Sequence, residues 1–209
     1  GPAVFTPIAG DGSKRVFWRV RVRESDSSYI AMENAPADDF LKRENVAYLN
    51  IGRHLRQKGL PLPEIYRFDL DKGWFLLEDF GDVSLQTACL QSIEKLPLYL
   101  PIVDILFQQQ TRGAEGFNTA WTCQTEQYDR GVMRRYEVDY FREAFLGTYL
   151  GLGKEQPGLE ESFEHLIEES SKAEEQFFLH RDFQSRNIMI TGGKIGILDW
   201  QGGRLGPLA

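Results

Sequence analysis

The segment from His180 to Asp199 constrains the fold of this chain more than any other part of its sequence. It reads HRDFQSRNIMITGGKIGILD. The apolar stretches on either side of TGGK predict two short strands joined by a tight turn, with a polar loop before them. Asn187 ends the loop and Asp199 follows the second strand, so these polar side chains should meet at one edge of a small sheet.

That arrangement suits phosphoryl transfer, a reaction that needs positioning and charge neutralisation and little covalent chemistry from the protein. Asp182 lies on the loop and could accept the proton of an attacking hydroxyl. Asn187 offers a neutral oxygen and Asp199 an anionic one for a Mg²⁺ ion that bridges phosphates. The alternative is structural, with His180 capping a turn and the aspartates on surface loops. The combined spacing and the loop–strand–turn–strand context favour the catalytic interpretation.

The first eighty residues predict a small antiparallel sheet with one helix. Residues 16–23 alternate in polarity, as a half-buried strand does, and a glycine-containing turn joins them to an apolar segment before them. A helix should begin at the Asp38–Asp39 pair and end at Lys58–Gly59. A hairpin turn is expected at residues 71–73. Four of the five predicted strands cover residues 5–8, 16–23, 29–33 and 74–78, and the segment LPLPEIYRFDL, residues 60–70, leads into the remaining one.

The rest of the chain predicts helices and then the short hairpin. Apolar residues recur at helical spacing in residues 96–110 and 128–150, and an acidic helix is expected at 160–175. A part rich in strands followed by a mostly helical part indicates an α+β fold.

Composition excludes several classes of partner. A formal charge of −7 and an isoelectric point near 5.1 argue against nucleic acid, which requires a basic surface. No apolar run reaches the roughly 18 to 20 residues of a membrane-spanning helix, so no membrane partner is expected. Cys89 and Cys123 are isolated in sequence, which favours a reducing, cytoplasmic location.

Several segments resemble a known superfamily. HRDFQSRNIMI and GILDWQGGRLGP are similar to the catalytic and metal-binding segments of aminoglycoside phosphotransferases and choline kinases, which share the protein-kinase-like fold. AGDGSKRVFWRV, LLEDFGD and YDRGVMRRYEVDYFREAFL resemble the branch of bacterial N-acetylmuramate/N-acetylglucosamine 1-kinases. The resemblance touches nearly the whole chain and is sharp only from His180 to Pro207.

The resemblance implies a bilobal α+β fold. Residues 1–80 would form the N-lobe, a five-stranded antiparallel sheet with one helix, and 78–81 the hinge. Residues 81–209 would form a mostly helical C-lobe with the catalytic loop at 180–187. Because chains of this family continue past the Gly-Pro of GRLGP, we expect the C-lobe to be incomplete at Ala209.

The resemblance also implies ATP and Mg²⁺ as cofactors and assigns roles to residues. His180, Asp182 and Asn187 would be catalytic, with Asp182 as the base, and Asn187 and Asp199 would hold the metal. The sequence DFG at residues 79–81 precedes the catalytic loop, so it marks the hinge and not the metal site. The candidate nucleotide-binding residues are Gly10, Gly12, Ser13, Lys14, Arg15, Glu78, Asp79 and Phe80, the last three through their main chain.

Three features depart from the family pattern. Gln184 and Trp200 replace a histidine and a phenylalanine that are common there. More seriously, residues 29–33 lack the lysine that grips the α and β phosphates in kinases. Lys14 or Arg15 could replace it, or both could be exposed turn cations. Glu44 lies on the predicted helix where kinases have the glutamate that pairs with the strand lysine. Without that lysine its partner is open, and a surface ion pair is the alternative.

We therefore predict an ATP-dependent kinase that phosphorylates a hydroxyl of a sugar or amino sugar. The alternatives are a nucleotide-binding, pseudokinase-type regulator, a kinase for an aminoglycoside, choline or homoserine, and a non-kinase interaction domain. Glu137, Asp139 and Glu143 are candidates to line the acceptor pocket, or solvated helix positions. The sequence predicts no oligomeric state.

Overall fold

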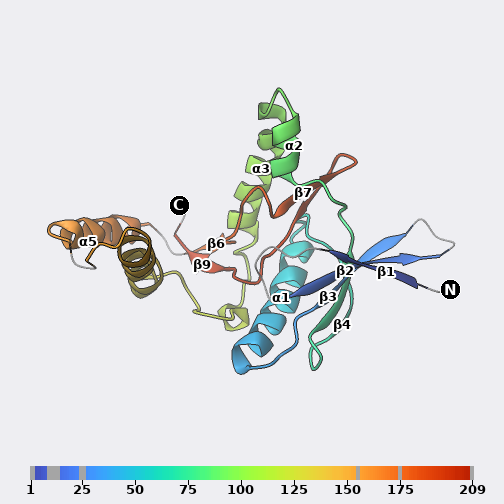
Figure 1. Ribbon diagram of the computed structural model, residues 1–209, viewed down its shortest axis with the longest axis horizontal. Helices are drawn as coiled ribbons and strands as arrows, with labels where there is room; N and C mark the ends of the chain where they lie inside the picture. The colour runs from blue at the N-terminus through green and yellow to red at the C-terminus, as the bar shows by residue number, and fades with distance from the viewer. Residues whose placement is uncertain (1–2, 9–14, 24–26, 154–155, 174–175, 208–209) are drawn as a thin grey trace.

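The computed structural model describes residues 3–8, 15–23, 27–153, 156–173 and 176–207. The first five strands form one antiparallel sheet in the order β1-β2-β3-β5-β4 (Figure 1). The five-stranded antiparallel sheet predicted from the sequence is thereby confirmed. The strands are β1 (Ala3–Ile8), β2 (Val16–Val22), β3 (Ser28–Glu33), β4 (Ile65–Asp69) and β5 (Trp74–Glu78).

The helix α1 (Asp39–Gln57) follows β3 and packs against the sheet. It begins where predicted because the Asp38 carboxylate accepts the Leu41 N–H at 2.8 Å and satisfies a donor that the first turn leaves open. It stops at Gly59, whose φ of +83° is a left-handed conformation that glycine adopts without strain. Ala47, Ile51 and Leu55 form its buried face.

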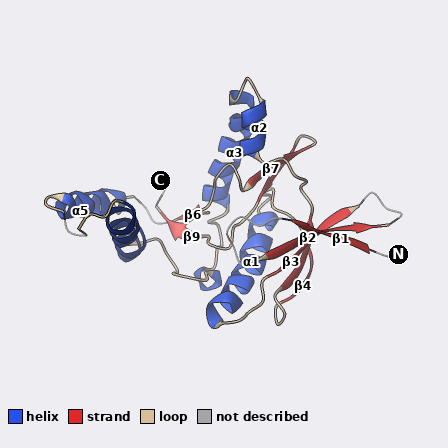
Figure 2. Ribbon diagram, viewed as in Figure 1, coloured by secondary structure: helices blue, strands red, loops and turns tan. Residues whose placement is uncertain are grey.

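Helices dominate the chain after the sheet (Figure 2). Two of the predicted helices are confirmed, while α2 was missed by the sequence analysis. The serine before α2, Ser84, caps it by accepting the Thr87 N–H at 3.2 Å. No helix within the described ranges is both long and apolar enough to cross a lipid bilayer. The helices that follow the sheet include α2 (Leu85–Gln91), α3 (Leu96–Arg112), the 3₁₀ turn η1 (Thr119–Trp121) and α5 (Leu159–Ser170).

The single helix predicted at 128–150 is wrong in detail. The structure has a short α4 (Arg130–Val132) and then two π-helical segments, η2 (Met133–Val138) and η3 (Phe141–Tyr149). The amphipathic spacing of a short segment does not distinguish i→i+4 from i→i+5 hydrogen bonding, so the sequence could not reveal this. Figure 1 shows these segments and α5 standing apart from the sheet.

The C-terminal strands form two small ladders. The predicted hairpin is confirmed as β7 (Ile188–Thr191) and β8 (Lys194–Ile197), which pair antiparallel across Gly192 and Gly193. The predicted strand before the catalytic loop is β6 (Phe177–Leu179). It pairs with β9 (Arg204–Gly206), a strand that the sequence analysis did not predict.

One hydrophobic core joins the sheet, α1 and the C-terminal strands. It contains Leu77 of β5 together with Ile102 of α3 and Phe178 of β6. The core contains residues from both sides of position 80. The division into an N-lobe of residues 1–80 and a C-lobe of residues 81–209 therefore stays a prediction. Trp200 is wholly buried within it, with its ring stacked 4.4 Å from that of Tyr48 and its Nε1 donating to the Tyr48 carbonyl at 2.8 Å.

Gly52 gives a direct test of this packing. A Cβ at this position would lie 2.7 to 2.8 Å from three atoms of the Trp200 indole, which its own hydrogen bond holds in place. Alanine favours a helix by about 1 kcal/mol over glycine. We nevertheless expect Gly52→Ala to lower the free energy of unfolding by about 1 to 2 kcal/mol, because overpacking outweighs propensity.

Urea unfolding of Gly52→Ala measures this cost. Gln57→Ala, on the exposed end of the same helix, serves as the control and should leave stability nearly unchanged. A Gly52→Ala protein as stable as the original would show that the indole does not fill this space.

Candidate nucleotide and catalytic site

A cleft of about 380 Å³ lies between the sheet, the hinge segment and the β7–β8 hairpin. It brings together residues that the sequence analysis chose independently, from segments far apart along the chain. Six of the ten residues predicted to bind nucleotide or metal line the cleft: Arg15, Glu78, Asp79, Phe80, Asn187 and Asp199. Gly10, Gly12, Ser13 and Lys14 lie outside the described residues.

The predicted catalytic loop, residues 180–187, connects β6 to β7 and is held by hydrogen bonds within itself. The Asn187 N–H donates to the Gln184 carbonyl at 2.9 Å, and the Asn187 side-chain nitrogen donates to the Asp182 carbonyl at 3.0 Å. This bond uses the nitrogen of the amide, and its oxygen is the atom suited to a cation. The loop thus fixes Asp182 and Asn187 relative to each other.

His180 supports the loop from inside the protein. It is only 3% exposed, and burial lowers its pKa to about 4, so the ring is neutral near pH 7. Its ring packs edge-on against Phe183, at 5.8 Å between centroids. The structure therefore places His180 beneath the loop, whereas Asp182 has an exposed side chain.

Asp182 and Asp199 influence each other electrostatically. Partial burial of the carboxyl and the negative charge of Asp199 raise the pKa of Asp182, while Arg181 opposes the shift. A raised pKa makes the carboxylate a better proton acceptor. The repulsion between the two carboxylates also favours a cation between or beside them.

Asp199 is held in an unusual conformation at the end of β8. Its φ is +66°, and Arg181 has a φ of +72°. Among the described residues these are the two non-glycine positions with positive φ, a strained conformation that tends to occur at functional sites. The Leu198 N–H donates to the Asn187 carbonyl at 2.8 Å, which ties the strand that carries Asp199 to the catalytic loop.

The residues present fit a Mg²⁺ ion. Asn187 and Asp199 supply hard oxygen donors that line the same cleft. In the described part of the chain no three His, Cys, Asp or Glu side chains gather as a metal cage. Mg²⁺ is usually bound by one or two protein groups together with phosphate oxygens and water.

The predicted hinge, residues 78–81, is held in place by the side chain of Asp79. This carboxylate, 4% exposed, accepts hydrogen bonds from Arg19 Nε at 2.6 Å, Ser28 Oγ at 2.8 Å and the Gly81 N–H at 2.8 Å. Burial alone would raise its pKa, but the bonds from Arg19 and Ser28 outweigh burial and the pKa lies below its usual value. The Asp79 carboxylate therefore secures the hinge to β2 and β3.

The neighbours of Asp79 are also engaged. The Glu78 N–H donates to the Glu64 carbonyl at 2.9 Å, and the Phe80 carbonyl accepts the Thr191 hydroxyl. Gly81 has a φ of +77°, which eases the change of direction that the sequence analysis expected here. The roles of Arg19 and of the Asp79 side chain were missed, since no local pattern joins residues this far apart.

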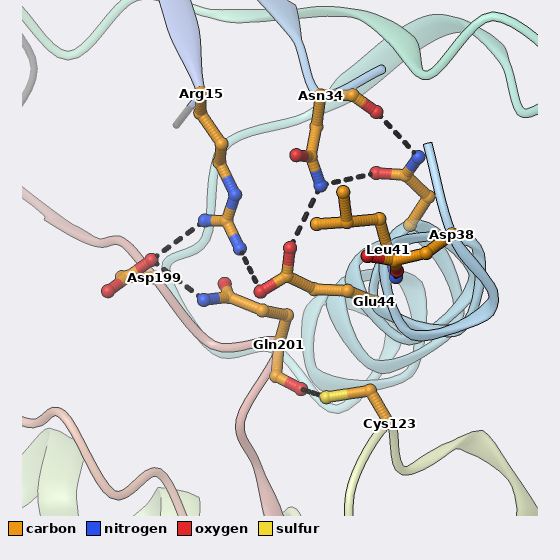
Figure 3. Close-up of polar contacts among 9 residues, drawn as sticks. Arg15, Asn34, Asp38, Leu41, Glu44, Cys123, Asp199 and Gln201 are labelled. Atoms are coloured by element: carbon orange, nitrogen blue, oxygen red, sulfur yellow. Dashed lines mark hydrogen bonds and ion pairs between the residues drawn. The ribbon is translucent and has the colours of Figure 1, made fainter. Parts of the chain in front are cut away.

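Arg15 and Glu44 form an ion pair at the cleft (Figure 3). The Arg15 Nη2 lies 2.9 Å from a Glu44 oxygen, and its Nη1 donates to Asp199 Oδ1 at 2.9 Å. Only 8% of the Arg15 side chain and 17% of the Glu44 side chain are exposed. The question left open for Glu44 is thus answered in part: its partner is Arg15, and the pair is not a surface one.

A larger groove of about 780 Å³ lies elsewhere, between η2, η3 and α5. Its lining is mainly apolar and includes Tyr128, Phe141 and Phe163, with Glu137 among its few charged groups. None of the residues predicted to be catalytic or to bind metal lines it. The smaller cleft is therefore the candidate site, although the groove is larger.

Comparison with known proteins shows which family the chain belongs to. The profile of the phosphotransferase enzyme family matches residues 4–209. An N-acetylmuramate/N-acetylglucosamine kinase of Neisseria meningitidis serogroup B is 29% identical over 209 residues, covering 98% of this chain and 58% of the relative. The kinase of the same description from Pseudomonas aeruginosa is 27% identical, covering 99% of this chain and 57% of the relative. The chain therefore spans less than two thirds of these relatives.

Solved structures show the same fold at low identity. An ethanolamine kinase of Plasmodium vivax matches 98% of this chain and 57% of its own with a TM-score of 0.63 and 14% identity. The ADP-bound aminoglycoside phosphotransferase APH(2″)-Ib also reaches 0.63, at 12% identity, over 99% of this chain and 68% of its own. The expected protein-kinase-like fold is confirmed, and the chain belongs to the phosphotransferase enzyme family.

Proposed function

We propose that the protein is an ATP-dependent small-molecule kinase that transfers the γ-phosphate to a hydroxyl of a sugar or amino sugar. One observation carries the proposal: a single cleft gathers the hinge main chain, Arg15, Asn187 and Asp199 next to the loop of Asp182. The names of the curated relatives support an amino sugar as the acceptor. A cytoplasmic location and a small-molecule partner belong to the same proposal.

Different residues of the cleft and the neighbouring loop would bind adenine, hold Mg²⁺ and accept the proton. Adenine would contact the main chain of residues 78–80, where the Glu78 N–H and the Phe80 carbonyl already have protein partners. The other main-chain N–H and C=O groups of residues 78–80 would therefore form the hydrogen bonds with adenine. Asn187 and Asp199 would hold Mg²⁺, which when bound neutralises phosphate charge. Asp182, with its raised pKa, would take the proton of the acceptor hydroxyl.

A second candidate is a nucleotide-binding regulator without catalysis. The observation that favours it is β3 (Ser28–Glu33), which contains no lysine. The Asp182, Asn187 and Asp199 set argues against it, since a regulator would have no need of the proton acceptor. Turnover and nucleotide binding, measured separately, distinguish the two.

Asp182→Asn tests the catalytic base. We expect it to lower turnover by about 10² to 10⁴, because asparagine cannot accept the hydroxyl proton. ATP affinity should change little, since Asp182 is not among the residues that line the nucleotide cleft. ATP consumption and calorimetric ATP binding measure the two effects, with exposed Asp104→Asn as the control. Turnover that survives in Asp182→Asn would refute the assignment of the base.

An acceptor screen tests the substrate class. N-acetylglucosamine and N-acetylmuramate should stimulate ATP consumption by the complete protein that carries this chain. An aminoglycoside, choline and homoserine should not, because each carries an ammonium group that the N-acetylated sugars lack. Stimulation by one of the latter three alone would overturn the acceptor class and keep the kinase. ATP binding with no stimulation by any acceptor would favour the regulator.

A further inference from the structure

The cleft contains an arginine where kinase-like enzymes use a strand lysine. In protein kinases a lysine on the third strand grips the phosphates and is held by a glutamate of the neighbouring helix. Here β3 has no lysine, but Arg15 immediately precedes β2, the strand that pairs with β3. The guanidinium of Arg15 lies between the Glu44 carboxylate of α1 and Asp199 (Figure 3).

Glu44 is itself oriented by a pair of buried amides. Asn34 Nδ2 donates to the Glu44 Oε2 at 2.9 Å and to the Asn45 Oδ1 at 2.9 Å. Asn45 Nδ2 returns a bond to the Asn34 carbonyl at 2.9 Å, and the Asn34 N–H donates to the Gly73 carbonyl at 2.8 Å. One Glu44 oxygen is therefore directed at Asn34 and the other at Arg15, so the carboxylate has a defined orientation.

The helix also supports the arginine through an aromatic ring. The Arg15 guanidinium carbon lies 5.8 Å from the centroid of the Tyr48 ring, within the range of a cation–π contact. Glu44 and Tyr48 are four residues apart, so they share one face of α1. An arginine held by a carboxylate and a ring loses little further freedom when it binds a phosphate, and its planar donors suit phosphate oxygens.

We propose that Arg15 supplies the phosphate-gripping cation that β3 lacks, with Glu44 and Asn34 as the residues that position it. This inference rests on the proposed function. The Glu44 contact is retained when nucleotide binds, and the contact with Asp199 is the one that a phosphate oxygen replaces. Glu44 thus serves a cation that comes from the start of β2 and not from β3.

The competing interpretation is that the ion pairs only fasten α1 to the Asp199 segment. In that case Arg15 would contribute to stability and would have no contact with a ligand. The two interpretations predict different effects of removing the Arg15 charge. Loss of a phosphate contact weakens the binding of ATP and leaves the binding of adenosine unchanged, whereas loss of a structural role weakens both alike.

Calorimetric binding of Mg-ATP and of adenosine therefore tests the inference in the complete protein. Arg15→Gln should raise the Kd for ATP by about tenfold or more, which is the loss of one charge-assisted contact. Its Kd for adenosine should stay within about twofold of the original value. Glu44→Gln, which keeps an amide for Asn34 but loses the charge, should weaken ATP binding in the same direction. Arg15→Lys should restore part of the ATP affinity.

The control is Lys58→Gln, which removes a cation paired with Glu115 at the other end of the same helix and should change neither affinity. Equal ATP affinity in Arg15→Gln and the original protein would overturn the inference alone. Equal weakening of ATP and adenosine in both Arg15 variants would favour the structural role and overturn it as well. If the original protein binds ATP no more tightly than adenosine, both this inference and the proposed function are overturned.

Discussion

The burial of Trp200 against α1 determines how α1 and the segment that carries Asp199 meet. The indole has no exposed surface, donates to the Tyr48 carbonyl, and fits only because Gly52 has no Cβ in its path. Trp200 follows Asp199 directly, so this contact sets the distance between α1 and the candidate metal ligand. The Arg15 bridge between Glu44 and Asp199 depends on that distance.

Charge explains much of the remaining architecture of the cleft. Glu44, Asp182 and Asp199 would repel one another in a partly buried site unless cations offset them. Arg15 contacts two of these carboxylates directly. At the predicted hinge, the positive charge of Arg19 likewise offsets the negative charge of Asp79. This charge arrangement supports the proposal that the cleft binds negative phosphates together with a divalent cation.

Sequence predicted the parts of the fold that local rules control. The cap at Asp38, the stop at Gly59 and the β7–β8 turn follow from residue type and spacing. The polar residues at strand ends, Asn187 and Asp199, line one cleft. Contacts between residues far apart in the sequence could not be predicted from local patterns. Arg15 and Asp199 are separated by 184 positions, and neither periodicity nor turn chemistry relates them. The β6–β9 pairing and the π-helical segments were missed for similar reasons, since tertiary packing decides both.

The central claim is that this cleft binds Mg-ATP through Asp199, and thermal unfolding with and without ligand tests it most directly. Mg-ATP should raise the melting temperature of the complete protein, because a ligand that binds only the folded state stabilises it. ATP with a chelator should raise it much less, and Asp199→Ala should lose most of the Mg-dependent part. A melting temperature that ATP leaves unchanged, with and without Mg²⁺, would contradict the account.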